Sequence, residues 1–195
     1  MFKKTLLAFL NAESGIAAIE MAFILPTMLL LYFGLMDVTG LVSMNRKITA
    51  SASITADLVG QQRTSILKPV IVDQYNASEM IMSPTPIANV RVEVFGYRAN
   101  AGLTSVTKIW HTSNNQGPSC GVDPDTANML PLMSAGNDLV VARSCISYTP
   151  YVTSFLGTTI MGSTSFLIKQ TISVRPRSSL QLTCYDSTVG GTICA

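Results

Sequence analysis

The strongest constraint on the fold is an apolar run near the N-terminus. Sixteen consecutive residues, 21–36, carry no charge; Glu20 is the nearest charged residue before them and Asp37 the first after them. As an α-helix, the 27 residues of 16–42 would measure about 40 Å, longer than the roughly 30 Å hydrocarbon core of a membrane. The run therefore predicts a transmembrane helix over residues 16–42, preceded by a leader peptide over residues 1–15.

A secretory signal peptide and a buried core helix are the competing interpretations of this run. A signal peptide has an apolar core of about 7–15 residues and a small-residue cleavage site after it. This run is longer and ends in Leu35-Met36-Asp37. A core helix seldom stays uncharged over such a length. A membrane helix fits best, with a kink expected at Pro26, which frees a backbone carbonyl.

Glu20 is the unusual residue in this segment, because a carboxylate within an apolar helix costs about 2.5–3.5 kcal/mol on membrane-insertion scales. Gly15 lies five positions before it, after a short polar leader. The stretch 15–37, which also contains the Leu-Pro pair at Pro26 and a glycine at Gly34, resembles the TadE-like family. These proteins are the pseudopilins of tight-adherence (Tad, or Flp) pili, a type IV pilus system. The resemblance is specific to about Leu58 and loose beyond it.

The resemblance implies a processing event and a role for the acid. A prepilin peptidase would cut between Gly15 and Ile16, and Glu20 would become the fifth mature residue. In an assembled filament it could neutralise the N-terminal ammonium of an adjacent subunit, since either charge alone would be costly in an apolar bundle. Asp37 is a second candidate for charge pairing or register. The simpler interpretation of Glu20 is an acid at headgroup level near the helix start.

The sequence departs from the family pattern on either side of the processing site. Basic residues often stand directly before the glycine in the family, whereas residues 11–14 here are Asn-Ala-Glu-Ser. The residue after the glutamate is often aromatic, and here it is Met21. Both departures bear on cleavage more than on membership of the family.

An amphipathic continuation of the helix is predicted over residues 43–60. Apolar side chains recur there at steps of three and four, with polar residues between them, and Gly60 is a typical C-terminal stop. The stripe consists of Leu41, Met44, Ile48, Ala52, Ala56 and Val59. It is expected to form ordinary core against a following domain.

Residues 61–195 are predicted to form an exported, β-rich domain. Alternating patterns indicate a half-buried strand over 90–95, a second over 103–110 pairing with it as a hairpin, and further strands over 139–148 and 166–174. Residues 66–74 fit a short strand or helix, 80–86 a loop and 112–137 a long loop. The expected fold class is α+β, a long helix packed on an antiparallel sheet, and the resemblance implies a pilin-like fold. Residues 148–177 also resemble, more weakly, the end of TadE-like chains.

The cysteines are confined to the exported domain and indicate an oxidising compartment. We therefore expect a cytoplasmic N-terminus and a periplasmic domain, in a single-pass protein of the bacterial inner membrane. Three pairings are possible, and we favour Cys120 with Cys145 and Cys184 with Cys194, the latter tying down a tail with little core of its own. A zinc site is disfavoured because it needs closely spaced ligand pairs, which are absent.

Composition and motifs argue against an enzyme and against nucleic-acid binding. The net charge is +2 with no basic run, and His111 is the single histidine, expected at a strand end or surface. No nucleophile elbow, phosphate loop or dinucleotide motif occurs. Asp123, Asp125 and Asn128 could form an oxygen cluster for calcium, but the stretch lacks the glycine at position 6 and the glutamate at position 12 of an EF-hand loop and fits turn formation better. No cofactor or metal is expected.

Three functional hypotheses follow. The first is a non-enzymatic pseudopilin or minor pilin acting in Tad/Flp pilus assembly. Its implied partners are the membrane, a prepilin peptidase, other pilus subunits and the assembly platform. The second is an uncleaved, membrane-anchored periplasmic binding protein that recognises a partner through the loop at 112–137. The third, a periplasmic enzyme, has the least support. The first residue of the mature protein discriminates the first hypothesis from the second.

Overall fold

The computed structural model describes residues 14–63, 65–150, 165–177, 181–186 and 192–194. Most of the expected leader, residues 1–13, lies outside these ranges. The helices are α2 (Ser14–Gly60) and α3 (Lys68–Met82), with short 3-10 turns at Ile87–Asn89 and Leu130–Leu132. The strands are β1 (Ser65–Leu67), β2 (Val90–Ala99), β3 (Val106–Ser113), β4 (Asp138–Tyr148), β5 (Phe166–Val174), β6 (Thr183–Asp186) and β7 (Thr192–Ile193).

The chain divides into two compact units, residues 1–40 with 150–164 and residues 41–149 with 165–195. In the first unit, the described residues are essentially the first part of α2. The second unit contains the remaining elements. Its main sheet is antiparallel with the order β3-β2-β4-β5. A helix and an antiparallel sheet confirm the α+β class, and the β2–β3 hairpin is confirmed as well.

A second, smaller sheet was not predicted. Its order is β1-β6-β7, and β1 pairs with β6 in parallel, so that Ile66 lies opposite Cys184. The pairing joins segments more than a hundred residues apart in the chain, and each strand is too short to show a periodic pattern.

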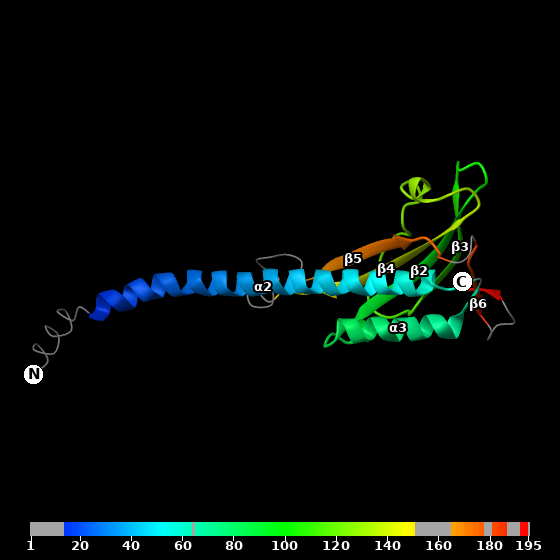
Figure 1. The fold of residues 1–195 in the computed structure, drawn as a ribbon. Helices are drawn as coiled ribbons and strands as arrows, with labels where there is room; N and C mark the ends of the chain where they lie inside the picture. Colours follow the sequence, from blue (N-terminus) through cyan, green and yellow to red (C-terminus); the bar gives the residue numbers. More distant parts are fainter. Residues whose placement is uncertain (1–13, 64, 151–164, 178–180, 187–191, 195) are drawn as a thin grey trace, which may run out of the picture. The chain divides into compact units, whose positions relative to one another are not determined.

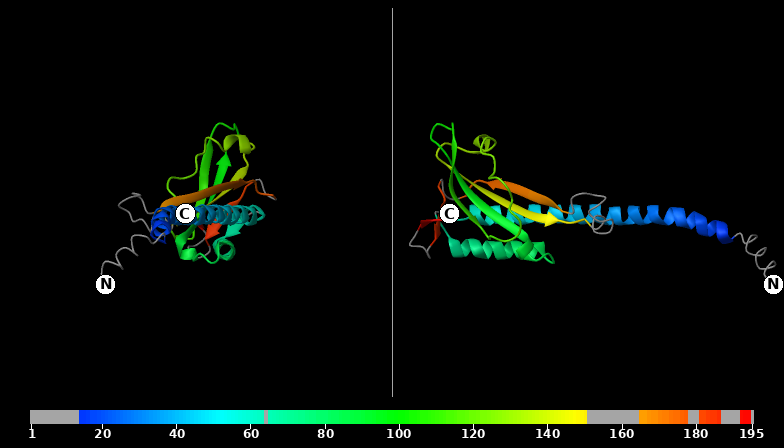
Figure 2. Two further views of the ribbon diagram at one scale, coloured as in Figure 1. Left: turned by 90° about the vertical axis from the view of Figure 1, so that its left-hand side faces the viewer. Right: turned by 180° about the vertical axis from the view of Figure 1, so that it is seen from behind.

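One face of the main sheet carries the larger core. There, the second part of α2 lies beside α3, and both helices lie on the same side of the sheet (Figures 1 and 2). The predicted stripe of α2 is buried as expected: Ile48, Ala52, Ala56 and Val59 are inaccessible, and Leu41 and Met44 pack against the core. Two hydroxyl pairs join the elements, Ser51–Ser144 at 3.2 Å and Thr55–Ser78 at 2.7 Å.

Helix α3 corrects the expected loop at 80–86, because it runs to Met82. Proline at its first turn is tolerated, since the missing N–H would have no helical partner there. The buried positions, Ile71, Gln74, Tyr75, Ser78 and Met82, follow helical spacing. Two of the five are polar, so the apolar pattern that would have revealed the helix is interrupted.

Strand β3 begins at Val106, three residues later than predicted. Leu103 has a φ of 52°, a left-handed conformation that no strand residue adopts. The Asn100 side-chain oxygen accepts hydrogen bonds from the backbone N–H groups of Thr104 (2.8 Å) and Ser105 (3.2 Å). These bonds hold residues 100–105 as the hairpin turn.

Strand β2 was predicted to be half-buried, and this is wrong, because both of its faces are covered. Val90, Val92 and Val94 face the helices. The opposite face is covered by the connection between β3 and β4, residues 114–137, which we call the strap. Met129 and Met133 of the strap form a second core with side chains of β2 and β4: Phe95, Tyr97, Ala99, Leu139 and Val141.

Candidate functional site

The first part of α2 presents apolar side chains that nothing in the described chain covers. Its large exposed residues are Ile16, Ile19, Met21, Phe23, Ile24, Leu25, Met28, Leu29, Leu30, Leu31, Tyr32, Leu35, Met36 and Val38. A soluble monomer rarely exposes a continuous apolar surface of this extent. Among the described helices, α2 alone is long and apolar enough to cross a membrane.

The hydroxyl groups in this segment are satisfied within the helix. Thr27 donates to the carbonyl of Ile24 at 2.7 Å, and Thr39 donates to that of Leu35 at 2.5 Å. Because each hydroxyl donates to a carbonyl of the preceding helical turn, it needs neither water nor another partner. A hydroxyl group can lie in lipid only when its hydrogen bond is satisfied in this way. Pro26 lies within the helix, and its ring leaves one carbonyl without the usual helical donor.

The predicted processing and pairing residues all lie on α2. Gly15 is in its first turn, and a side chain built at this position would meet no atom within 4 Å. At 1.5 Å per residue, Glu20 lies about 7.5 Å further along the axis. Asp37 lies another 25 Å or so from Glu20 and about 100° around the helix. The two acids are therefore not neighbours and cannot serve one contact.

A second group of polar residues lies on the strap face of the main sheet. Arg143 of β4 binds Glu93 of β2 through Nε at 2.9 Å and through Nη2 at 2.5 Å. Its Nη1 donates to the carbonyl of Val122 in the strap at 2.5 Å. The side chains are 4% and 7% exposed. Arg143 therefore pairs with a buried acid and holds the strap to the sheet.

The sequence reasoning missed this pair. The available signal was an acid, Glu93, between two valines of β2 and a base, Arg143, directly after the apolar run 139–142 of β4. The β2–β4 register, which places the two residues opposite each other, could not be read from the sequence.

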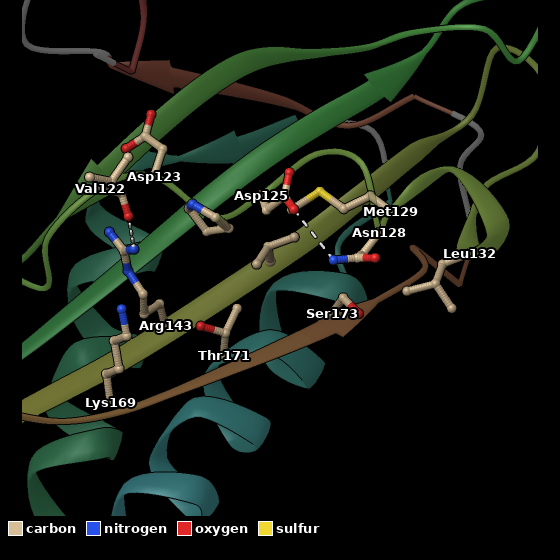
Figure 3. A pocket seen from close by; sticks show the side chains of 12 residues that line it. Val122, Asp123, Asp125, Asn128, Met129, Leu132, Arg143, Lys169, Thr171 and Ser173 are labelled. Atoms are coloured by element: carbon tan, nitrogen blue, oxygen red, sulfur yellow. Dashed lines mark hydrogen bonds between the residues drawn. The ribbon is translucent and has the colours of Figure 1, made fainter.

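A pocket of about 490 Å³ opens between the strap and strands β4 and β5 (Figure 3). Arg143, Lys169, Thr171 and Ser173 line it from the sheet. The strap contributes Val122, Asp123, Pro124, Asp125, Asn128, Met129 and Leu132. This is the surface that the binding-protein hypothesis would use.

The acids of the strap are already engaged. Asp123 pairs with Lys108, and this bond lowers the pKa of Asp123. Asp125 accepts from the backbone N–H of Ala127 at 3.0 Å and from the amide of Asn128. Within the described residues no group of three His, Cys, Asp or Glu side chains could hold a metal.

His111 lies within β3 and not at its end, which corrects the prediction. Its ring stacks on Phe95 at 4.5 Å between centroids, and burial lowers its pKa. Its Nε2 is buried, and no described residue bonds to it. The hydroxyl of Tyr97 is in the same situation, and burial raises its pKa to about 12. The described residues thus give His111 no hydrogen-bonded nucleophile, as general-base catalysis would require.

Two disulfides close the second unit, and no described cysteine is free. Cys120 of the strap bonds to Cys145 of β4, and Cys184 of β6 bonds to Cys194 after β7. The pairing is sequential, and it fastens the strap and the C-terminal tail to the sheets. Disulfides are typical of an oxidising compartment.

Comparison with known proteins gives one match. A family model described as TadE-like protein matches residues 15–57, a range that contains Gly15, Glu20 and Asp37 and lies wholly within α2. The chain therefore carries a TadE-like N-terminal region, as its residues indicated. The comparisons with curated proteins and with solved structures found no match.

Proposed function

We propose that this chain, with its TadE-like region at residues 15–57, is a non-enzymatic subunit acting in the assembly of Tad/Flp pili, a minor pilin or pseudopilin. The first part of α2 anchors the protein in the inner membrane before assembly. Helix contacts with other pilus subunits or with the assembly platform then perform its function. The domain that follows residue 60 lies in the periplasm, where its disulfides form.

The observation that carries the proposal is the division of α2 into two kinds of surface. Up to about residue 40 most of its large apolar side chains are exposed, whereas from Ile48 onward its apolar stripe is core. A helix used only as core would be covered along its length. An uncovered apolar part suits lipid before assembly and neighbouring helices afterwards.

Glu20 has a specific role in this proposal. After cleavage behind Gly15, the new ammonium of Ile16 and the carboxylate of Glu20 lie within two turns of each other on every subunit. Pairing the carboxylate with the ammonium of a neighbouring subunit neutralises both charges in an apolar bundle, where an unpaired charge would cost several kcal/mol.

The first test is the N-terminal residue of the protein isolated from membranes, determined by intact mass. We expect it to start at Ile16 in the wild type and at Met1 in Gly15→Leu. Gly34→Leu is the matched control, because a side chain at Gly34 also meets no atom within 4 Å; this variant should be processed normally. A wild-type protein that starts at Met1 would remove processing from the proposal and favour the anchored binding protein.

The second test separates anchoring from assembly. Glu20→Gln keeps the size of the side chain and removes its charge, so we expect the variant to stay in the membrane and to be cleaved. Piliation, counted by electron microscopy in cells carrying only the variant, should fall. Normal piliation in Glu20→Gln would show that the carboxylate does not pair in assembly.

A further inference from the structure

A shallow apolar pocket of about 400 Å³ lies beside the start of β5, within the second unit. Its walls are Leu41, Val42 and Asn45 from α2 and residues 166–169 from β5. Three of its apolar side chains remain well exposed: Val42 (46%), Phe166 (43%) and Leu167 (41%). The side-chain amide of Gln170 donates to Asn45 at 2.8 Å and fixes β5 against the helix.

The position of Val42 along α2 locates this surface relative to a membrane. The apolar segment 16–42 is about 40 Å long as a helix, against a hydrocarbon core of about 30 Å. When the helix crosses a membrane with its uncharged run 21–36 centred in that core, residues 39–42 lie in the headgroup layer. Phe166 and Leu167 line the same pocket as Leu41 and Val42, so the start of β5 lies at that level too.

The chemistry of the surface suits the boundary between headgroups and acyl chains. Phe166 packs against Tyr148 with ring centroids 5.4 Å apart, and aromatic rings are enriched at this depth. Lys169 is exposed at the edge of the pocket, where a long basic side chain can reach the phosphates. In the sequence, residues 144–168 carry no charge at all. Among the residues that line the pocket, Lys169 is the only charged one.

We propose that this membrane-proximal patch, Val42, Phe166 and Leu167 with Lys169 beside them, inserts into the interfacial layer of the membrane that α2 crosses. The domain then has a second membrane contact in addition to its helix. Lipid is the occupant that the chain favours, because Leu41 and Val42 follow the apolar part of α2 directly in the sequence and belong to the same helix. The proposal rests on α2 crossing a membrane and not on any role in a pilus.

The test measures the depth of a nitroxide label on the full chain reconstituted in phosphatidylcholine–phosphatidylglycerol vesicles. Leu167→Cys and Phe166→Cys report on the patch. Val122→Cys is the matched control, an exposed apolar residue on the strap, and Leu30→Cys is the reference inside the apolar segment. Mass spectrometry first verifies that each variant keeps both disulfides. Power saturation then compares collisions with oxygen, which enters lipid, and with a nickel chelate, which stays in water.

We expect the oxygen-to-nickel collision ratio at Leu167 and Phe166 to exceed that at Val122 several-fold and to lie below that at Leu30. A ratio at both patch positions equal to that at Val122 would overturn the proposal, because the patch would then face water. Low collision rates with both reagents would overturn it in favour of a second copy or another protein covering the patch. A nickel-accessible label at Leu30 would remove the premise, and the proposal with it, whatever the outcome of the piliation tests.

Discussion

Replacing Arg143 by Met removes one partner of the most buried ion pair described on the strap face. The carboxylate of Glu93 then stays buried, 7% exposed, with Arg91 at 3.7 Å as its remaining cation. The strap also loses the bond from Arg143 to the carbonyl of Val122. Breaking a buried pair from one side costs about 3–5 kcal/mol, and Arg91 offsets part of this. We expect the free energy of unfolding to fall by about 3 kcal/mol.

The double variant Glu93→Gln with Arg143→Met tests the reason for that loss. It leaves no buried charge, and replacing a whole buried pair by uncharged side chains is often nearly neutral. We therefore expect the double variant to be more stable than Arg143→Met alone, with a coupling energy of about 2 kcal/mol between the two positions.

The assay is denaturant unfolding of the full chain in detergent micelles, followed by the emission of Trp110. This is the only tryptophan of the chain, and it is buried in the core on the helix side of the sheet, away from the substitutions. Lys108→Met is the control, because its pair with Asp123 is 44% and 49% exposed and should contribute at most about 1 kcal/mol. The reasoning is refuted if Arg143→Met costs no more than Lys108→Met, or if the double variant is additive.

Three further predictions use the same unfolding assay. A Cβ at Gly96 would lie 2.2 Å from the indole nitrogen of Trp110, so Gly96→Ala should cost about 3 kcal/mol by overpacking; unchanged stability would show that the indole moves aside. Tyr97→Phe removes a buried hydroxyl with no partner among the described residues and should not destabilise at pH 7. Because the pKa of Tyr97 is raised to about 12 in the folded chain, the unfolded chain releases this proton first, near pH 10, and stability falls as pH rises from about 10 towards 12; Tyr97→Phe should lose less stability over this range, and equal losses would contradict this. Burial lowers the pKa of His111, so the unfolded chain binds the proton first, near pH 6.5, and stability falls below that pH; His111→Gln should flatten the decline, measured between pH 7.5 and 5.5.

The residues of α2 were sufficient to predict it because its two halves carry different and strong patterns. The first half is an uncharged run, and the second carries apolar residues at steps of three and four. Both patterns are local in the sequence and repeat over several helical turns. The same holds for β5. The alternating pattern predicted a strand over residues 166–174, and these are its bounds in the structure. The predicted pattern of Gly15, Glu20 and Asp37 is local in sequence, and so the family match covers it.

The parts that could not be predicted depend on contacts between distant segments. α3 buries Gln74 and Ser78, and Ser78 is satisfied by Thr55 of α2, a partner that no local pattern reveals. The second covered face of β2 depends on the strap, whose Cys120 is fixed by Cys145. The Arg143–Glu93 pair likewise exists only once the strand register is set.

The composition of the core also sets an order of events during synthesis. Val59 near the end of α2 belongs to a core that is completed by Leu182, close to the C-terminus. At about 5–20 residues per second, roughly 6–25 s separate the synthesis of these two positions. During that interval the stripe of α2 is already made, whereas the elements that cover it are added one after another and the core is complete only with Leu182. The nascent chain thus presents an incompletely covered apolar surface that extends beyond the uncharged run 21–36, and this surface needs protection until synthesis is complete.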